Sequence, residues 1–246
     1  MRWPSGGPRR LAGRTPGSLT DKGSPVLRLA LYAAPPADHP LAEKTALWLS
    51  NPPPLAGFSA ETLHALTADP RHYGFHATLK APFALAAGAT PDLVIDAARR
   101  FALHRAAPPP LTLTVRALGP FLALVPPAPV PAIDALAAGC LRSFEPFRAP
   151  SDPADLARRR AAGLTPSQDA HLARWGYPYV LGDYRFHMTL SGPLIDADRR
   201  EALSRALAEW LAPALAIPVS FRDLCVFGQD DRATPFSLVA RLPFGG

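Results

Sequence analysis

Two stretches of the chain repeat one pattern, YGFHATLK at residues 73–80 and YRFHMTLS at residues 184–191. Both contain Phe-His-x-Thr-Leu, and in both a small residue and a proline follow shortly after the leucine. The chain has seven histidines in 246 residues. At this composition, two chance copies of His-x-Thr-Leu have odds on the order of one in a thousand. The repeat therefore indicates a duplicated element that carries a function.

Each motif alternates as a strand does, with one polar and one apolar side. Residues two apart in a strand point to the same face about 6 to 7 Å apart. His76 and Thr78 should therefore project together, and so should His187 and Thr189. The apolar residues between and beside them should face the opposite, packed side.

Outward from the two motifs, strand and helix candidates alternate along both halves of the chain. Prolines at expected first helical turns and Gly-Pro or Pro-Pro pairs at expected turns set the boundaries. The expected strands lie at 26–32, 75–85, 184–190, 219–227 and 236–242, with two more inside 111–125; the expected helices lie at 40–50, 61–68, 90–104, 131–143 and 196–211, and 152–175 is expected to be an inserted helical excursion.

This order predicts an α+β fold in which each histidine strand is followed by a helix and then by paired strands. We expect a bilobal architecture of two pseudo-symmetric antiparallel sheets that face a central cleft, with helices packed on the outside. Residues 25–246 should form this single domain. Residues 1–24, which are rich in Gly, Pro, Ser and Arg, are expected to be a disordered tail.

Composition limits the other classes of function. The chain is 48% hydrophobic and 19% charged, which suits a globular domain with a sizeable core. No apolar run reaches the roughly 18 to 20 residues of a membrane span, so we expect a cytoplasmic protein without membrane contact. Two distant cysteines, Cys140 and Cys225, indicate neither a disulfide framework nor a zinc site.

The net charge of +6 is weak support for a nucleic-acid partner. Residues 1–24 hold a net charge of +4, and arginine makes up nearly all of the basic residues, with only Lys22, Lys44 and Lys80 as lysines. Such a bias fits a GC-rich coding sequence as well as it fits phosphate binding. A near-neutral domain favours a small phosphorylated substrate over a polynucleotide, although an RNA end stays open as a partner.

Two imidazoles and two hydroxyls around one small volume suit a phosphodiester. One histidine can remove a proton from the attacking oxygen while the other protonates the leaving oxygen. Thr78 and Thr189 can donate hydrogen bonds to the nonbridging phosphate oxygens. The His/Thr pairs have two alternative explanations. The histidines can be strand residues that only bond a neighbouring carbonyl, or they can ligate zinc, although neither motif supplies a third ligand.

The paired motifs resemble the two-histidine (2H) phosphoesterases, a superfamily defined by two His-x-Thr/Ser motifs in a bilobal fold. Their wording is most similar to a poorly characterised bacterial branch associated with phosphonate metabolism, and the likeness covers about residues 26–245. The resemblance implies that His76 and His187 are catalytic and that Thr78 and Thr189 bind phosphate. Departures are the long N-terminal extension and the proline-rich loops, which affect the rim of the cleft.

Three further residues beside the motifs are candidate substrate ligands. Lys80 and Arg185 have the strand parity of the histidines, and a guanidinium matches phosphate oxygens in pairs. Tyr73 has the wrong parity for a regular strand, so packing is its expected role unless it stacks on a substrate.

The sequence thus predicts a phosphoric diester hydrolase, a metal-independent and cofactor-free phosphodiesterase that acts on a cyclic phosphate or another small phosphodiester. The resemblance places it in phosphonate metabolism. The alternatives are an RNA-end 2′,3′-cyclic phosphodiesterase or ligase-like RNA-processing enzyme, and a non-catalytic protein that binds a phosphate ligand. The exact substrate, the oligomeric state and the assignment of base and acid to the two histidines stay open.

Overall fold

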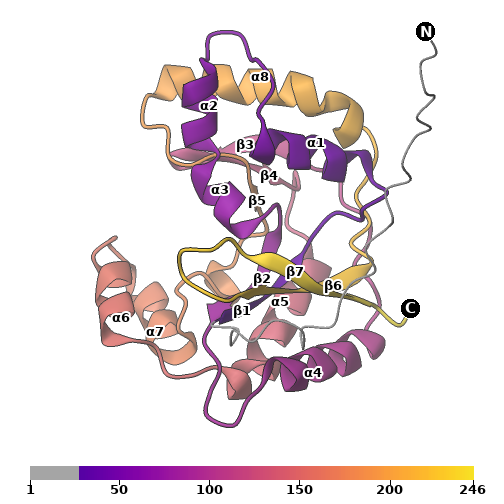
Figure 1. Cartoon of the computed structure of the whole chain (residues 1–246), viewed down its shortest axis with the longest axis vertical. Coiled ribbons are helices and arrows are strands. Elements are labelled where there is room, and N and C mark those ends of the chain that lie inside the picture. The colour runs from indigo at the N-terminus through magenta and orange to yellow at the C-terminus, as the bar shows by residue number, and fades with distance from the viewer. Residues whose placement is uncertain (1–27) are drawn as a thin grey trace, which may run out of the picture.

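The computed structural model describes residues 28–246, and the expected tail at 1–24 lies outside them. The fold is α+β, as predicted: one antiparallel sheet of seven strands with helices packed on it (Figure 1). The strands are β1 (Arg28–Ala33), β2 (Ala77–Phe83), β3 (Thr114–Leu118), β4 (Phe121–Val125), β5 (Met188–Thr189), β6 (Asp223–Gln229) and β7 (Ser237–Pro243).

Most helices begin where the sequence predicts, because their caps are encoded locally. In the helix expected at 90–104, the Thr90 side chain accepts a hydrogen bond from the Leu93 N–H and Pro91 occupies the first turn. The helices are α1 (Pro40–Ser50), α2 (Ala60–Leu66), α3 (Ala68–Tyr73), α4 (Pro91–Leu103), α5 (Pro131–Ser143), α6 (Pro153–Arg160), α7 (Pro166–Trp175) and α8 (Ala197–Leu215). The short helix α3 was not expected from the sequence.

The sheet is single and continuous, which corrects the expectation of two separate sheets. The strand order is β3-β4-β5-β2-β1-β6-β7. The two histidine strands, β2 and β5, are direct neighbours at the centre, with β1 and β6-β7 on one side and β4-β3 on the other. The two halves therefore join edge to edge instead of facing each other as separate layers, because β5 bonds both β4 and β2.

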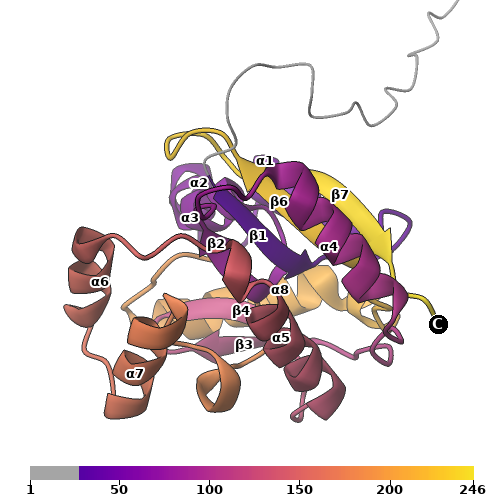
Figure 2. The same ribbon diagram turned by 90° about the horizontal axis from the view of Figure 1, so that it is seen from below.

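Alternate strand residues build the core on one face of the sheet. Leu31 of β1, Ala77 of β2, Leu124 of β4 and Met188 of β5 are buried in one cluster with the apolar sides of α1, α2, α4, α5 and α8. In Figure 2, α4 lies over β6 and β7. Helix α5 packs against β2. The opposite face of these strands is left for the histidine motifs.

The expected helical excursion at 152–175 forms α6 and α7. Both views show this pair of helices projecting to one side of the molecule, away from α8 and α4 (Figures 1 and 2). Each begins with a capped first turn, and α7 has a full capping box in which Thr165 and Gln168 exchange side-chain and backbone bonds. Within residues 28–246, no helix is long and apolar enough to cross a membrane.

A β-bulge in β2 turns Lys80 away from the histidine face. Tyr32 of β1 pairs with Thr78, but the next residue, Leu31, pairs with Lys80, so Leu79 is an extra residue on β2. One inserted residue reverses the alternation of a strand. Lys80 therefore shares the face of Leu31, which is the face that packs against α5.

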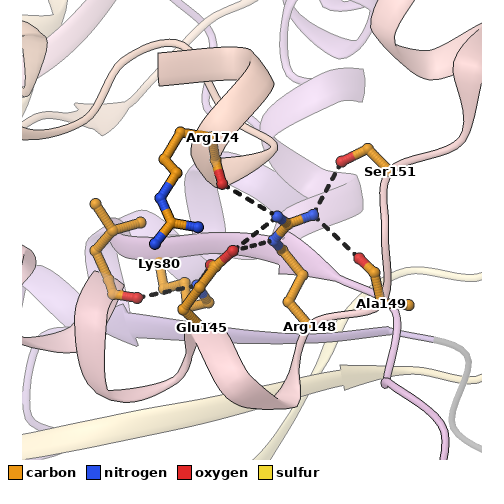
Figure 3. Close-up of polar contacts among 7 residues, drawn as sticks. Lys80, Glu145, Arg148, Ala149, Ser151 and Arg174 are labelled. Carbon is orange, nitrogen blue, oxygen red and sulfur yellow. Dashed lines mark hydrogen bonds and ion pairs between the residues drawn. The ribbon is translucent and has the colours of Figure 1, made fainter. Parts of the chain in front are cut away.

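The Lys80 ammonium is buried and paired at the end of α5 (Figure 3). It donates to the Leu141 carbonyl at 3.2 Å and to Glu145 at 3.0 Å. The other oxygen of Glu145 accepts bonds from Arg148 at 2.7 and 3.0 Å. These two partners lower the pKa of Glu145 against the opposing effect of burial. One carboxylate thus holds two cations at the junction of β2 and the segment after α5.

Glu145→Ala should leave both cations without a carboxylate, and Lys80 is only 3% exposed. Removing one partner of a buried ion pair costs about 3 kcal/mol or more. We expect a loss of roughly this size in the free energy of unfolding, measured by urea denaturation. The control is Glu201→Ala on α8, whose carboxylate is 69% exposed and 3.9 Å from Arg205. Equal stabilities for the two variants would contradict the proposed weight of this network.

Candidate functional site

The two His-x-Thr motifs lie side by side on β2 and β5. These antiparallel strands pair Ala77 with Met188. The same register sets His76 opposite Thr189 and Thr78 opposite His187. Ala77 and Met188 are fully buried, whereas the four motif residues are half-buried on the other face. The predicted division into a packed apolar side and a less buried polar side is confirmed for both motifs.

Cross-strand neighbours have Cβ atoms about 4.5 to 5.5 Å apart. The two imidazoles and the two hydroxyls therefore occupy the corners of one small patch, related by a local two-fold axis through the Ala77–Met188 pair. The predicted meeting of the two halves occurs, but within one sheet and between adjacent strands. The patch therefore holds polar groups from both motifs.

Both histidines are oriented by the same local bond. The Nδ1 atom of His76 lies 2.9 Å from the Gly74 carbonyl oxygen, and Nδ1 of His187 lies 2.8 Å from that of Arg185. A carbonyl only accepts, so Nδ1 carries the proton in each ring and donates it. In the neutral ring Nε2 is then an acceptor, and Nε2 of His76 lies 3.2 Å from the Thr78 hydroxyl. The bond to a neighbouring carbonyl, which the sequence allows as a purely structural role, sets the tautomer of each imidazole.

The surroundings of the two imidazoles differ. His76 stacks on Tyr32, with ring centroids 3.6 Å apart and planes 17° apart, and Phe227 lies 6.4 Å away. Burial, opposed by the bond to the Gly74 carbonyl and aided by the nearby His187, lowers the pKa of His76 to about 4. His187 has one aromatic neighbour, Phe121, at 5.9 Å.

A cavity of about 630 Å³ opens beside the patch. It is large enough for a small phosphorylated metabolite, since small-molecule pockets measure about 300 to 1,000 Å³. Its wall combines Thr78 and His187, one residue from each motif, with the segment that leads into β5 and with α7, whereas His76 and Thr189 do not line it. Lining residues include Thr78, His187, Tyr177, Tyr179, Asp183 and Arg185.

The three secondary candidates have different positions. Arg185 is exposed and lines the cavity, in agreement with the prediction. Tyr73 packs on Phe236, with ring centroids 5.5 Å apart, and does not line the cavity, as its parity suggested. Lys80 was expected on the histidine face and is instead turned away by the β-bulge and held by Glu145.

Sequence reasoning missed the aromatic residues of the site. Tyr32 lies on β1, outside both motifs, and reaches His76 only because β1 pairs with β2. Tyr177 and Tyr179 come from the loop after α7, and their rings meet edge to face at 5.7 Å. The sequence Tyr-Pro-Tyr at 177–179, shortly before the second motif, is the signal that could have pointed to these two tyrosines. Among residues 28–246, no cluster of three or more His, Cys, Asp or Glu side chains could hold a metal ion.

Comparison with known proteins identifies a family and two relatives. A family profile described as "Protein of unknown function (DUF1045)" matches residues 78–237, more than half of the chain. A protein of Janthinobacterium sp. (strain Marseille), named ribose 1,5-bisphosphate phosphokinase PhnN, is 39% identical over 90% of this chain and 51% of its own length. A protein of the same name from Laribacter hongkongensis (strain HLHK9) is 34% identical over 86% of this chain and 50% of its own length.

These names correct the predicted reaction class. The sequence predicts a phosphoric diester hydrolase, but both relatives are named as phosphokinases, which transfer a phosphoryl group. The prediction was wrong because paired imidazoles and hydroxyls are compatible with several kinds of phosphate chemistry and do not specify which group accepts the phosphorus. The chain spans about half the length of the curated relatives it matches.

His76 should make stability depend on pH. Its pKa is about 4 in the folded state and near 6.5 in an unfolded chain. Between these values the unfolded state binds more protons, so the free energy of unfolding should fall as pH decreases from 6.5 to 4. The slope from this group is at most about 1.4 kcal/mol per pH unit. His76→Asn should remove this contribution, as measured by urea denaturation across pH.

An NMR titration of the His76 ring gives a second readout, with assignment from the His76→Asn spectrum. The ring should stay neutral until the pH approaches 4. Titration of that signal near 6.5 in the folded protein would contradict the effect of burial.

Proposed function

The chain belongs to the DUF1045 family of proteins of unknown function, and on that premise we propose that it binds the phosphate ester of a small phosphorylated metabolite between His76 and His187. The metabolite is a phosphorylated ribose, and the role lies in phosphonate metabolism. The relatives' names, which combine PhnN with ribose 1,5-bisphosphate, support both the ligand class and the pathway. The kinase activity in those names is that of proteins about twice as long.

The single observation that carries the proposal is the register of β2 and β5. It sets an imidazole opposite a hydroxyl twice, around one local axis and beside a 630 Å³ cavity. Packing alone does not require His-x-Thr on both strands, since Ala77 and Met188 already fill the core side. A His-x-Thr motif on each of β2 and β5 is explained if both motifs bind the same anion.

The chain's own residues would divide the work at that anion. Thr78 and Thr189 donate hydrogen bonds to nonbridging oxygens, where the negative charge is concentrated. Neutral His76 accepts a hydrogen bond at its Nε2 lone pair from a hydroxyl of the ligand or of the phosphate. His187 and Arg185 contact the ligand from the cavity wall, where the guanidinium attracts the anion.

Isothermal titration calorimetry with ribose 5-phosphate and ribose 1,5-bisphosphate tests the proposal. We expect the wild-type protein to bind at least one of these ligands, and His187→Ala and Thr78→Val to weaken binding by tenfold or more. Loss of one hydrogen bond to a charged group corresponds to about 1.5 to 3 kcal/mol, a factor of roughly 10 to 150. Added EDTA should leave the affinity unchanged, because the proposed contacts need no metal.

The matched control is His104→Ala, which removes an exposed histidine at the end of α4. Its affinity should equal that of the wild-type protein. Absence of binding to both ligands, or equal weakening by His104→Ala and His187→Ala, would rule the proposal out.

A further inference from the structure

A second, smaller pocket of about 150 Å³ adjoins the cavity. The two hollows share four wall residues, Ala81, Leu141, Tyr177 and Val180. The small pocket lies between β2, the segment after α5, and α6. These shared residues place the recess directly beside the cavity.

The wall of this second pocket is strongly basic. It contains six basic side chains against two acidic ones. The basic residues are Arg28, Lys80, Arg148, Arg158, Arg159 and Arg232, and the acidic residues are Asp152 and Asp155.

Most of these charges are already compensated. Lys80 and Arg148 share Glu145 behind the wall (Figure 3). Arg158 and Arg232 share Asp155, at 2.7 and 3.3 Å.

Two guanidinium groups are left over. Within the described part of the chain, Arg28 and Arg159 have no carboxylate within 4.0 Å. Arg28 bonds the neutral Gln229 side chain at 2.8 Å and lies over the Phe236 ring, and Arg159 lies 5.1 Å from the centre of the Tyr177 ring. Cations held by neutral partners in a recess are available to an anion.

Arg28 is partly buried in the wall of this pocket. Burial lowers its pKa, and the charge of Arg232 lowers it further. Arg28 lies on the same side of β1 as Tyr32, which is four residues further along the strand. Tyr32 in turn stacks on His76. The basic pocket is therefore linked to the histidine patch by β1 on one side and by Tyr177 on the other.

We propose that this basic pocket, at Arg28 and Arg159, binds a second phosphate group of the same ligand. This inference rests on the proposed function and narrows its ligand class to a small sugar that carries two phosphates. One phosphate lies between the histidines, the sugar spans the cavity beside Tyr177, and the other phosphate enters the recess. Glu145 and Asp155 each pair with two of the remaining four cations.

A small bisphosphate fits this pocket better than a nucleic acid does. A polynucleotide track needs a groove that follows several successive phosphates. Here Arg28 and Arg159 line a single recess of about 150 Å³, about a quarter of the volume of the adjoining cavity. The recess offers a place for one terminal phosphate.

The test compares ribose 1,5-bisphosphate with ribose 5-phosphate by calorimetry, using the full chain. The wild-type protein should bind the bisphosphate at least tenfold more tightly. Arg28→Met and Arg159→Met keep the apolar stems and remove the charges, and each should reduce this preference to about threefold or less without weakening ribose 5-phosphate. Arg160→Met is the matched control, because Arg160 is next to Arg159, is exposed, and pairs with Asp169 outside the pocket.

Each outcome separates the subsite from the site. If both sugars bind with equal affinity, or if the Arg28 and Arg159 variants keep the preference, the second subsite is wrong while the proposed function stands. If neither sugar binds, the proposed function fails and this inference fails with it. Arg159→Met carries the test alone if Arg28→Met does not fold, since Arg159 lies on the surface helix α6. A six-nucleotide RNA with a 3′-phosphate that binds more tightly than the bisphosphate, and loses affinity in the same variants, would assign the pocket to RNA and overturn the proposal.

Discussion

The site depends on one pairing, that of Ala77 on β2 with Met188 on β5. This contact closes the central seam of the seven-stranded sheet, and it alone fixes which residues of the two motifs stand opposite each other. Because β5 has only two residues in the sheet, its position is secured by other bonds. The Trp48 indole donates to the Leu190 carbonyl at 2.7 Å, and the Leu190 N–H donates to the Leu122 carbonyl at 2.8 Å. A slip by one residue would turn the imidazole and the hydroxyl of one motif into the core.

Most of this arrangement could be read from the sequence. The parity of His-x-Thr predicts which side of each strand is packed, and the buried Ala77 and Met188 confirm that side. Capping residues such as Thr90 located the helices, because a cap is a local interaction. What could not be read was non-local: whether two related strands pair with each other or with separate sheets is decided by edge contacts between residues more than a hundred positions apart.

The role of Lys80 shows the same limit on a smaller scale. Period-two alternation assigned it to the histidine face, and a single extra residue in β2 sent it to the opposite side. Its ammonium then acquired Glu145, which is close in space and 65 residues away in sequence. The aromatic wall of the site was hidden for a similar reason, since Tyr32 reaches His76 only across a strand pair. The reaction class lay beyond the motif altogether, because His and Thr identify an oxyanion and not the fate of its bonds.

The local two-fold axis through the Ala77–Met188 pair relates the backbones of the two motifs, but the surroundings of their side chains differ. One imidazole is enclosed between Tyr32 and Phe227, and the other stands at the mouth of an aqueous cavity beside Arg185. Duplication of a single peptide motif thus yields two chemically identical rings in unlike dielectrics. Two copies of His-x-Thr thus stand in different surroundings, so the two sides of the patch are not equivalent for any ligand that lies between them.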